Sequence, residues 1–71
     1  MAKFERIVRD PEIRGGQPTF KGTRVMVWIV FECIKAGMPF SEILEEYPSI
    51  TQDDIDAAFD YVVKILQKTR R

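Results

Sequence analysis

The sequence predicts a small α+β protein, mainly α-helical, in which a short N-terminal β-hairpin precedes a three-helix bundle. Three observations support this class. The chain has only 71 residues, which is the size of one domain. Glycine and proline are frequent in residues 15–25, as in the turns of a hairpin. Apolar residues then recur at helical spacing through the last third of the chain.

The predicted hairpin occupies the first third of the chain. Phe4 to Arg9 favours a strand, and Asp10-Pro11 ends it because proline removes a backbone donor and restricts the residue before it. Gly15-Gly16 permits positive φ and a sharp reversal. Pro18 to Lys21 can then form the second strand.

The stretch GGQPTFKGTRV (residues 15–25) can also be compared with a phosphate-binding loop. Such a loop places its lysine directly after the second glycine, so that the lysine and backbone N–H groups reach the phosphates together. Here Lys21 precedes Gly22, and Pro18 has no N–H. The stretch therefore predicts a turn and a strand, with Thr23 able to satisfy loose backbone donors before the first helix.

The first helix is expected to begin at Met26 or Val27 and to end at Ala36. Gly37 stands where a helix-ending glycine is expected, and Lys35 opposes the negative end of the helix dipole. Composition alone is equally compatible with a buried strand, but the length and the glycine favour a helix.

Two further helices are expected, and their close spacing predicts a helix-turn-helix. The second runs from Ser41, a good N-cap, to Tyr47, and about three residues (48–50) join it to the third. Thr51 and Asp54 resemble a capping box at the start of the third helix, which extends to about Lys68. The predicted apolar stripe of this helix consists of Ile55, Ala58, Phe59, Val62, Ile65 and Leu66.

The chain is expected to form one domain, with a hairpin arm (1–24), a trihelical core (25–68) and a basic tail (69–71). A chain of this size buries only about 60% of the surface that its unfolded form exposes. Cys33 is the only cysteine and there is no histidine, so neither an intrachain disulfide nor a zinc staple is expected. Self-association, as a homodimer, or a partner protein is the remaining source of stability.

Charge is divided along the chain although the totals cancel, with 11 basic and 11 acidic residues. Residues 1–37 hold seven basic and four acidic side chains, residues 38–63 hold seven acidic ones, and residues 64–71 hold four basic ones. The N-terminus lacks the apolar region of a secretory signal. The apolar run in residues 25–34 is about half the ~20 residues that a membrane span requires. We therefore expect a cytoplasmic protein with no membrane partner.

No group of residues predicts an enzyme, a cofactor or a metal site. Cys33 lies in an apolar run without a histidine base, which favours a packed thiol over a nucleophile. Asp53, Asp56 and Asp60 share one helix face that could hold a hard cation, but a solvated acidic face near the positive end of the helix dipole is the better interpretation.

The first predicted helix is apolar on all sides and must therefore be covered on all sides. Trp28 and Phe31 lie on faces different from that of Val30 and Cys33. Either the hairpin and the last two helices cover this helix between them, or Trp28 and Phe31 form a self-association or partner interface.

Two segments, IVRDPEIRGGQPTFKGTRV and AGMPFSEILEEYPSITQDDIDAAFDYV, resemble the domain of unknown function 433 family over nearly the whole chain. The sequence departs from the family at Met26, where the family often carries proline. The resemblance implies a small prokaryotic protein with a homeodomain-like or winged-helix-like core. It further implies a VapB-like antitoxin that neutralises a PIN-like nuclease toxin, and it implies no catalytic residues.

Three classes of function remain open: an antitoxin with or without autoregulatory DNA binding, a stand-alone DNA-binding regulator, and a structural adaptor. Helix-turn-helix proteins read DNA with the start of the second helix, but here that segment, QDDID, carries three carboxylates that oppose a polyanion. The basic head is the better DNA-binding candidate, through Lys3, Arg6, Arg9, Arg14, Lys21 and Arg24, with the tail residues Lys64, Lys68, Arg70 and Arg71 able to touch phosphates.

The acidic middle of the chain suits a protein partner, because a nuclease must present positive surface for RNA. The candidate partner-binding residues are Glu42, Glu45, Glu46, Asp53, Asp56 and Asp60. In an alternative arrangement, an arginine of the basic tail enters the acidic metal site of the nuclease.

Overall fold

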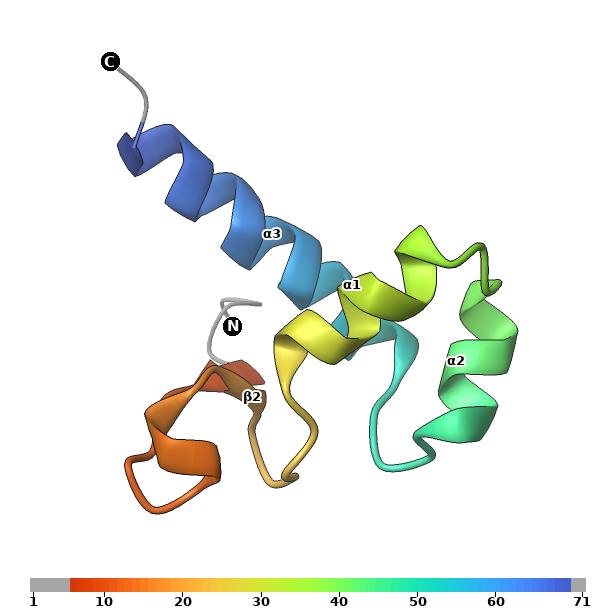
Figure 1. Ribbon diagram of the computed structural model, residues 1–71, viewed down its shortest axis with the longest axis horizontal. Helices are drawn as coiled ribbons and strands as arrows, with labels where there is room; N and C mark the ends of the chain where they lie inside the picture. Colours follow the sequence, from red (N-terminus) through yellow and green to blue (C-terminus); the bar gives the residue numbers. More distant parts are fainter. Residues whose placement is uncertain (1–5, 70–71) are drawn as a thin grey trace.

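The computed structural model describes residues 6–69 and has the α+β, mainly helical architecture that the sequence predicts. A two-stranded antiparallel hairpin precedes three α-helices (Figure 1). In Figure 1 the hairpin arm lies on one side of α1 and α2 lies on the other. The elements are β1 (Ile7–Val8), the 3₁₀ turn η2 (Arg14–Gly16), β2 (Thr19–Phe20), α1 (Val27–Lys35), α2 (Phe40–Glu46) and α3 (Gln52–Thr69).

The strands of the hairpin are shorter than the sequence predicts. They pair in the register Ile7 opposite Phe20 and Val8 opposite Thr19, and Phe4, the predicted start of the first strand, lies outside the described residues. The first strand ends early because the Asp10 carboxylate accepts a hydrogen bond from the Glu12 backbone N–H at 2.9 Å and turns the chain.

The reversal predicted at Gly15-Gly16 is confirmed. Both glycines have positive φ, at 66° and 88°, and Arg14 before them has a φ of 53°. An arginine in this left-handed region is uncommon, because its Cβ crowds the following carbonyl. Two glycines in succession let the rest of the turn follow without that cost.

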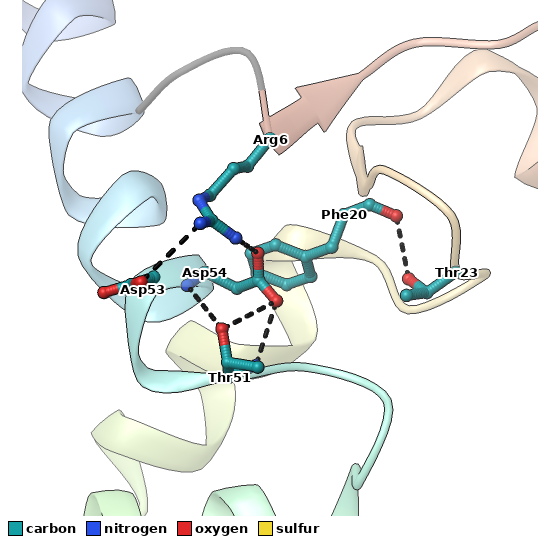
Figure 2. A network of polar contacts seen from close by, with 6 residues as sticks. All are labelled: Arg6, Phe20, Thr23, Thr51, Asp53 and Asp54. Atoms are coloured by element: carbon teal, nitrogen blue, oxygen red, sulfur yellow. Dashed lines mark hydrogen bonds and ion pairs between the residues drawn. The ribbon is translucent and has the colours of Figure 1, made fainter. Parts of the chain in front are cut away.

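A tight turn joins β2 to the segment before α1, where a phosphate-binding loop was considered. The Thr23 backbone N–H donates to the Phe20 carbonyl at 2.9 Å, and Gly22 has a φ of 81°, as the third residue of a type II turn requires. The Thr23 hydroxyl also donates to the Phe20 carbonyl at 2.9 Å (Figure 2) and accepts from the Val25 N–H at 3.0 Å. The predicted role of Thr23 is thus confirmed.

The ends of α1 follow local rules that are readable in the sequence. The helix begins at Val27, with Met26 extended as the N-cap. At the other end, the Gly37 N–H donates to the Ile34 carbonyl at 2.9 Å, and the Met38 N–H donates to Cys33 at 3.0 Å. This is a Schellman motif, which needs the left-handed φ of 89° that Gly37 adopts.

The predicted N-cap of α2 is wrong. Ser41 lies inside the first turn, and Pro39, in an extended conformation, is the residue that precedes the helix. The Pro39 carbonyl already accepts the N–H groups of Glu42 and Ile43, at 3.0 and 3.1 Å, so the helix starts before Ser41 can act as a cap. The helix ends at Glu46, because the residue before Pro48 is disfavoured in a helical conformation.

The connection between α2 and α3 spans residues 47–51, which makes it longer than the three residues predicted. The predicted capping box at its end is confirmed. The Thr51 N–H donates to Asp54 Oδ2 at 2.9 Å, and the Asp54 N–H donates to Thr51 Oγ1 at 3.4 Å. Ile50 before the cap and Ile55 in the first turn are both buried, as in a hydrophobic staple.

The core lies between the hairpin, α1, α2 and the first half of α3. Its buried apolar residues are Ile7, Phe20, Val27, Val30, Ile43, Ile50, Ile55, Ala57 and Ala58.

The predicted apolar stripe of α3 is only partly buried. Ile55 and Ala58 are buried, but Phe59, Ile65 and Leu66 are exposed. The reason is length, since the 18 residues of α3 span about 27 Å while the nine residues of α1 span about 14 Å. The C-terminal half of α3 therefore projects beyond the elements that could cover it (Figure 1).

Candidate interaction surfaces

The described residues hold no cluster of three or more histidine, cysteine, aspartate or glutamate side chains placed to bind a metal ion. Cys33 is a free thiol of intermediate burial that packs against the core. None of the helices within residues 6–69 is long and apolar enough to cross a membrane. The features of this molecule that could bind a partner are its charged faces and its exposed apolar side chains.

Arg6 and Asp53, which were predicted to bind different partners, contact each other at the N-terminus of α3. Arg6 Nη2 lies 3.6 Å from Asp53 Oδ2, and Arg6 Nη1 donates to Asp54 Oδ1 at 3.2 Å (Figure 2). Asp54 is buried and also accepts a hydrogen bond from the Thr51 N–H. One carboxylate therefore caps α3 and binds Arg6, the residue directly before β1. The sequence offers no local signal for this contact, because the two residues are 48 positions apart.

The N-terminal end of α3 is therefore occupied by contacts within the chain. The guanidinium of Arg6 lies between two of the three carboxylates of the first turns. The third, Asp56, accepts a hydrogen bond from Gln52 Nε2 at 3.4 Å. A glutamine amide can read an adenine edge, but here the amide of Gln52 is engaged by Asp56. The carboxylates and this internal pairing disfavour α3 as a DNA-reading helix.

The remaining basic candidates lie on the hairpin arm. Arg9, Arg14, Lys21 and Arg24 are exposed, whereas Lys3 lies outside the described residues. Arg14 Nε donates to the Arg24 carbonyl at 3.2 Å, which brings these two residues together. None of the four forms an ion pair with another residue in the range 6–69. We call these four residues the basic arm.

The acidic candidates lie on α2 and α3. The side chains of Glu42, Glu45 and Glu46 on α2 and of Asp60 on α3 are exposed, and that of Asp56 is half-buried. None of these five pairs with a basic side chain in the described part of the chain. The three glutamates share the outward side of α2, whose Ile43 is fully buried. We call these five residues the acidic face.

An apolar surface joins α1, α2 and α3. The rings of Phe31 and Phe59 meet edge to face with centroids 5.3 Å apart, and Phe40 lies 6.2 Å from Phe59. Trp28 is exposed beside them. An open pocket of about 190 Å³ is lined by Pro18, Val27, Trp28, Phe31, Tyr61 and Val62.

The sequence identified Trp28 and Phe31 as surface candidates but missed Phe40 and Phe59. Trp28 is exposed, whereas Phe31 is half-buried against Phe59. Phe59 was assigned to the apolar stripe of its helix, but Phe31 and Phe40 cover only part of its ring. A second open pocket, of about 350 Å³, lies on another side of α3 and is lined by Ile7, Tyr61, Lys64, Ile65 and Lys68.

Comparison with known proteins gives consistent matches. The profile of a family described as "Protein of unknown function (DUF433)" matches residues 7–62. The uncharacterized protein y4eO of Sinorhizobium fredii is 37% identical over 60 residues, which cover 84% of this chain and 27% of that protein. This chain therefore spans about a quarter of the length of that relative.

A solved structure is also similar. The crystal structure of a DUF433 member protein from Anabaena variabilis superimposes with a TM-score of 0.79 at 32% sequence identity. The match covers 89% of this chain and 62% of the other. The fold described above is thus shared with an experimentally determined relative.

Proposed function

This chain belongs to the DUF433 family, and from that premise we propose that it is a non-catalytic binding module that neutralises a nuclease toxin by direct contact. One observation carries the proposal. Four of the five residues of the acidic face are exposed, none of the five forms an ion pair with the described basic side chains, and the face lies on the helices rather than on the basic arm. The molecule thus presents its negative charge outward, where a partner can reach it.

A nuclease that cleaves RNA needs a positive surface for the phosphate backbone. A protein with a complementary negative surface competes for that surface and is steered towards it. Glu42, Glu45 and Glu46 are exposed on α2, and α2 lies on the opposite side of α1 from the hairpin arm (Figure 1). Desolvated charge pairs formed there would account for inhibition without chemistry on this chain.

The experiment is a pull-down of tagged protein from the host cell at moderate salt, followed by an RNA-cleavage assay on whatever is recovered. We expect one small nuclease in near-equal amount, whose cleavage of RNA stops when the purified chain is added. Reversal of Glu42, Glu45 and Glu46 to lysine should abolish inhibition. The matched control reverses Arg9, Lys21 and Arg24 to glutamate, which should leave inhibition intact.

Two outcomes decide against this proposal. Recovery of the chain without a nuclease removes the antitoxin role. Inhibition that survives reversal of the three glutamates removes the acidic face as its cause. A chain truncated after Gln67 tests the alternative in which a tail arginine enters the nuclease site, and that alternative requires inhibition to be lost on truncation.

The basic arm supports a second candidate function, binding of operator DNA. Its four exposed side chains lie on a hairpin, and two-stranded ribbons can enter a DNA groove. If each contacts one phosphate, the logarithm of the binding constant should fall with a slope of about −0.9 per contact against the logarithm of salt concentration. The arm reversal described above should abolish DNA binding, whereas the α2 reversal should strengthen it or leave it unchanged.

A further inference from the structure

From Phe59 onwards, α3 carries an apolar stripe that the rest of the described chain covers only in part. Phe59, Val62, Val63 and Leu66 have the i, i+3, i+4, i+7 spacing that places side chains on one face of a helix. Phe59 and Val63 are 38% and 51% exposed, and Leu66 is 61% exposed. The same spacing forms the seam between two paired helices.

This stripe is continuous with the apolar surface around α1 and α2. Phe59 touches the rings of Phe31 and Phe40, and Val62 lines the same pocket as Trp28. Trp28 and Phe40 are themselves 51% and 40% exposed. The stripe and the pocket therefore form one face, with a ridge along α3 and a hollow beside its middle.

The extent of this face matches what a stable dimer requires. An aromatic side chain has about 200 Å² of surface and an aliphatic one somewhat less, so the exposed fractions above amount to roughly 450 Å² of apolar area. A standard interface buries about 800 Å² on each partner, and homodimer interfaces are about 65% apolar, which corresponds to roughly 500 Å².

We propose that this face binds a second copy of the chain, with the two α3 helices packed antiparallel about a two-fold axis near Val62 and Val63. An isologous interface requires a surface that is complementary to itself, and a ridge beside a hollow meets that requirement. Under this symmetry Leu66 of one copy lies near the pocket lined by Trp28 and Phe31 of the other.

Charge selects the antiparallel direction. The first half of α3 carries Asp53, Asp54, Asp56 and Asp60, and the second half carries Lys64 and Lys68. Parallel helices would set acidic half against acidic half, and the helix dipoles would also align. Antiparallel helices keep the two acidic halves apart and oppose the helix dipoles. The inference does not depend on a nuclease, because the apolar face does not include Glu42, Glu45 or Glu46, the residues that the inhibition assay reverses.

The test is sedimentation velocity of the full chain between about 1 and 100 μM, with two matched variants. The wild type should sediment as a dimer. Val63→Lys should raise the dissociation constant at least about tenfold, because it places a charge in the seam. Ile65→Lys is an equally drastic change two residues away on another side of α3, and it should leave the dimer intact. Helicity by circular dichroism confirms that each variant folds.

Thermal unfolding of the wild type keeps the proposal testable if a variant does not fold. Dimerisation makes the melting temperature rise with protein concentration, and a monomer shows no such rise. A monomeric wild type at 100 μM would overturn the proposal, as would equal dissociation by Val63→Lys and Ile65→Lys.

Cross-linking tests the direction of the helices. In a Cys33→Ser background, Val62→Cys should form a disulfide-linked dimer on mild oxidation, because it lies near the two-fold axis. Gln67→Cys should not, because antiparallel packing separates the two copies of this residue by several turns. Efficient cross-linking through Gln67→Cys would show parallel packing and overturn the arrangement.

Discussion

Thr19 offers a sharp test of how this small core is held together. Thr19 lies on β2 and is fully buried, and its Oγ1 atom has no hydrogen-bond partner among the described residues. A buried hydroxyl without a partner costs about 1–3 kcal/mol. Replacing Thr19 with valine keeps the shape of the side chain and removes that unpaired group.

We expect Thr19→Val to stabilise the protein by about 1 kcal/mol, at the low end of that range because the unfolded chain also changes. For a domain of this size, 1 kcal/mol raises the melting temperature by about 4–8 °C. The assay is thermal and urea unfolding followed by circular dichroism, at one fixed protein concentration so that self-association does not alter the comparison.

Thr23→Val provides the matched control, since it makes the same chemical change at a hydroxyl that is fully used. That hydroxyl donates to the Phe20 carbonyl and accepts from the Val25 N–H, so its loss should destabilise the protein by about 1–2 kcal/mol. The two substitutions should thus have opposite signs. If Thr19→Val lowers stability as much as Thr23→Val, the Thr19 hydroxyl is hydrogen-bonded in solution, and the reasoning about this core is refuted.

Three further predictions concern the caps, and urea unfolding measures all of them. Asp54→Ala should cost about 2 kcal/mol, because it removes the α3 capping box and leaves Arg6 without its buried partner. Arg6→Met should lower the free energy of unfolding by at most about 1 kcal/mol, because the ion pairs of Arg6 are partly exposed. If it destabilises the protein as much as Asp54→Ala does, the capping box is not the main contribution of Asp54. Gly37→Ala should lower the free energy of unfolding by about 1 kcal/mol or more, because alanine is strained at the left-handed φ of this position. Steric contact is not the cause, since a Cβ there meets nothing within 4 Å. An unchanged urea midpoint would refute the Schellman assignment.

The features that the sequence predicted correctly depend on a few neighbouring residues. The glycine reversal, the Thr23 turn, the end of α1 at Gly37 and the Thr51–Asp54 capping box are all closed by hydrogen bonds between residues at most five apart. Each of these motifs requires a specific side chain or a positive φ, so the residue type alone identifies it.

The features that the sequence missed depend on the lengths and placement of distant elements. Ser41 has the chemistry of a cap, but the Pro39 carbonyl starts the helix first. Leu66 and Ile65 continue the apolar pattern of α3, yet no described element is long enough to bury them. The contact between Arg6 and Asp54 joins opposite ends of the sequence, and charge counts alone do not predict which ions meet.

The structure also changes how the charged sets are understood. Two of the predicted site residues, Arg6 and Asp53, contribute to an internal contact at the start of α3. The other charged candidates among the described residues form the basic arm and the acidic face, which lie on different elements. Separate charged surfaces would allow one small protein to contact a nuclease through α2 and DNA through the hairpin.

The central claim is neutralisation of a nuclease through the acidic face, and the most direct measurement is the rate of RNA cleavage by the co-recovered nuclease titrated with this chain. The account predicts that cleavage falls to background near one equivalent of wild-type chain. It also predicts that cleavage persists when Glu42, Glu45 and Glu46 are replaced by lysine. Cleavage that continues unchanged with excess wild-type chain, or that both chains inhibit equally, would contradict the account.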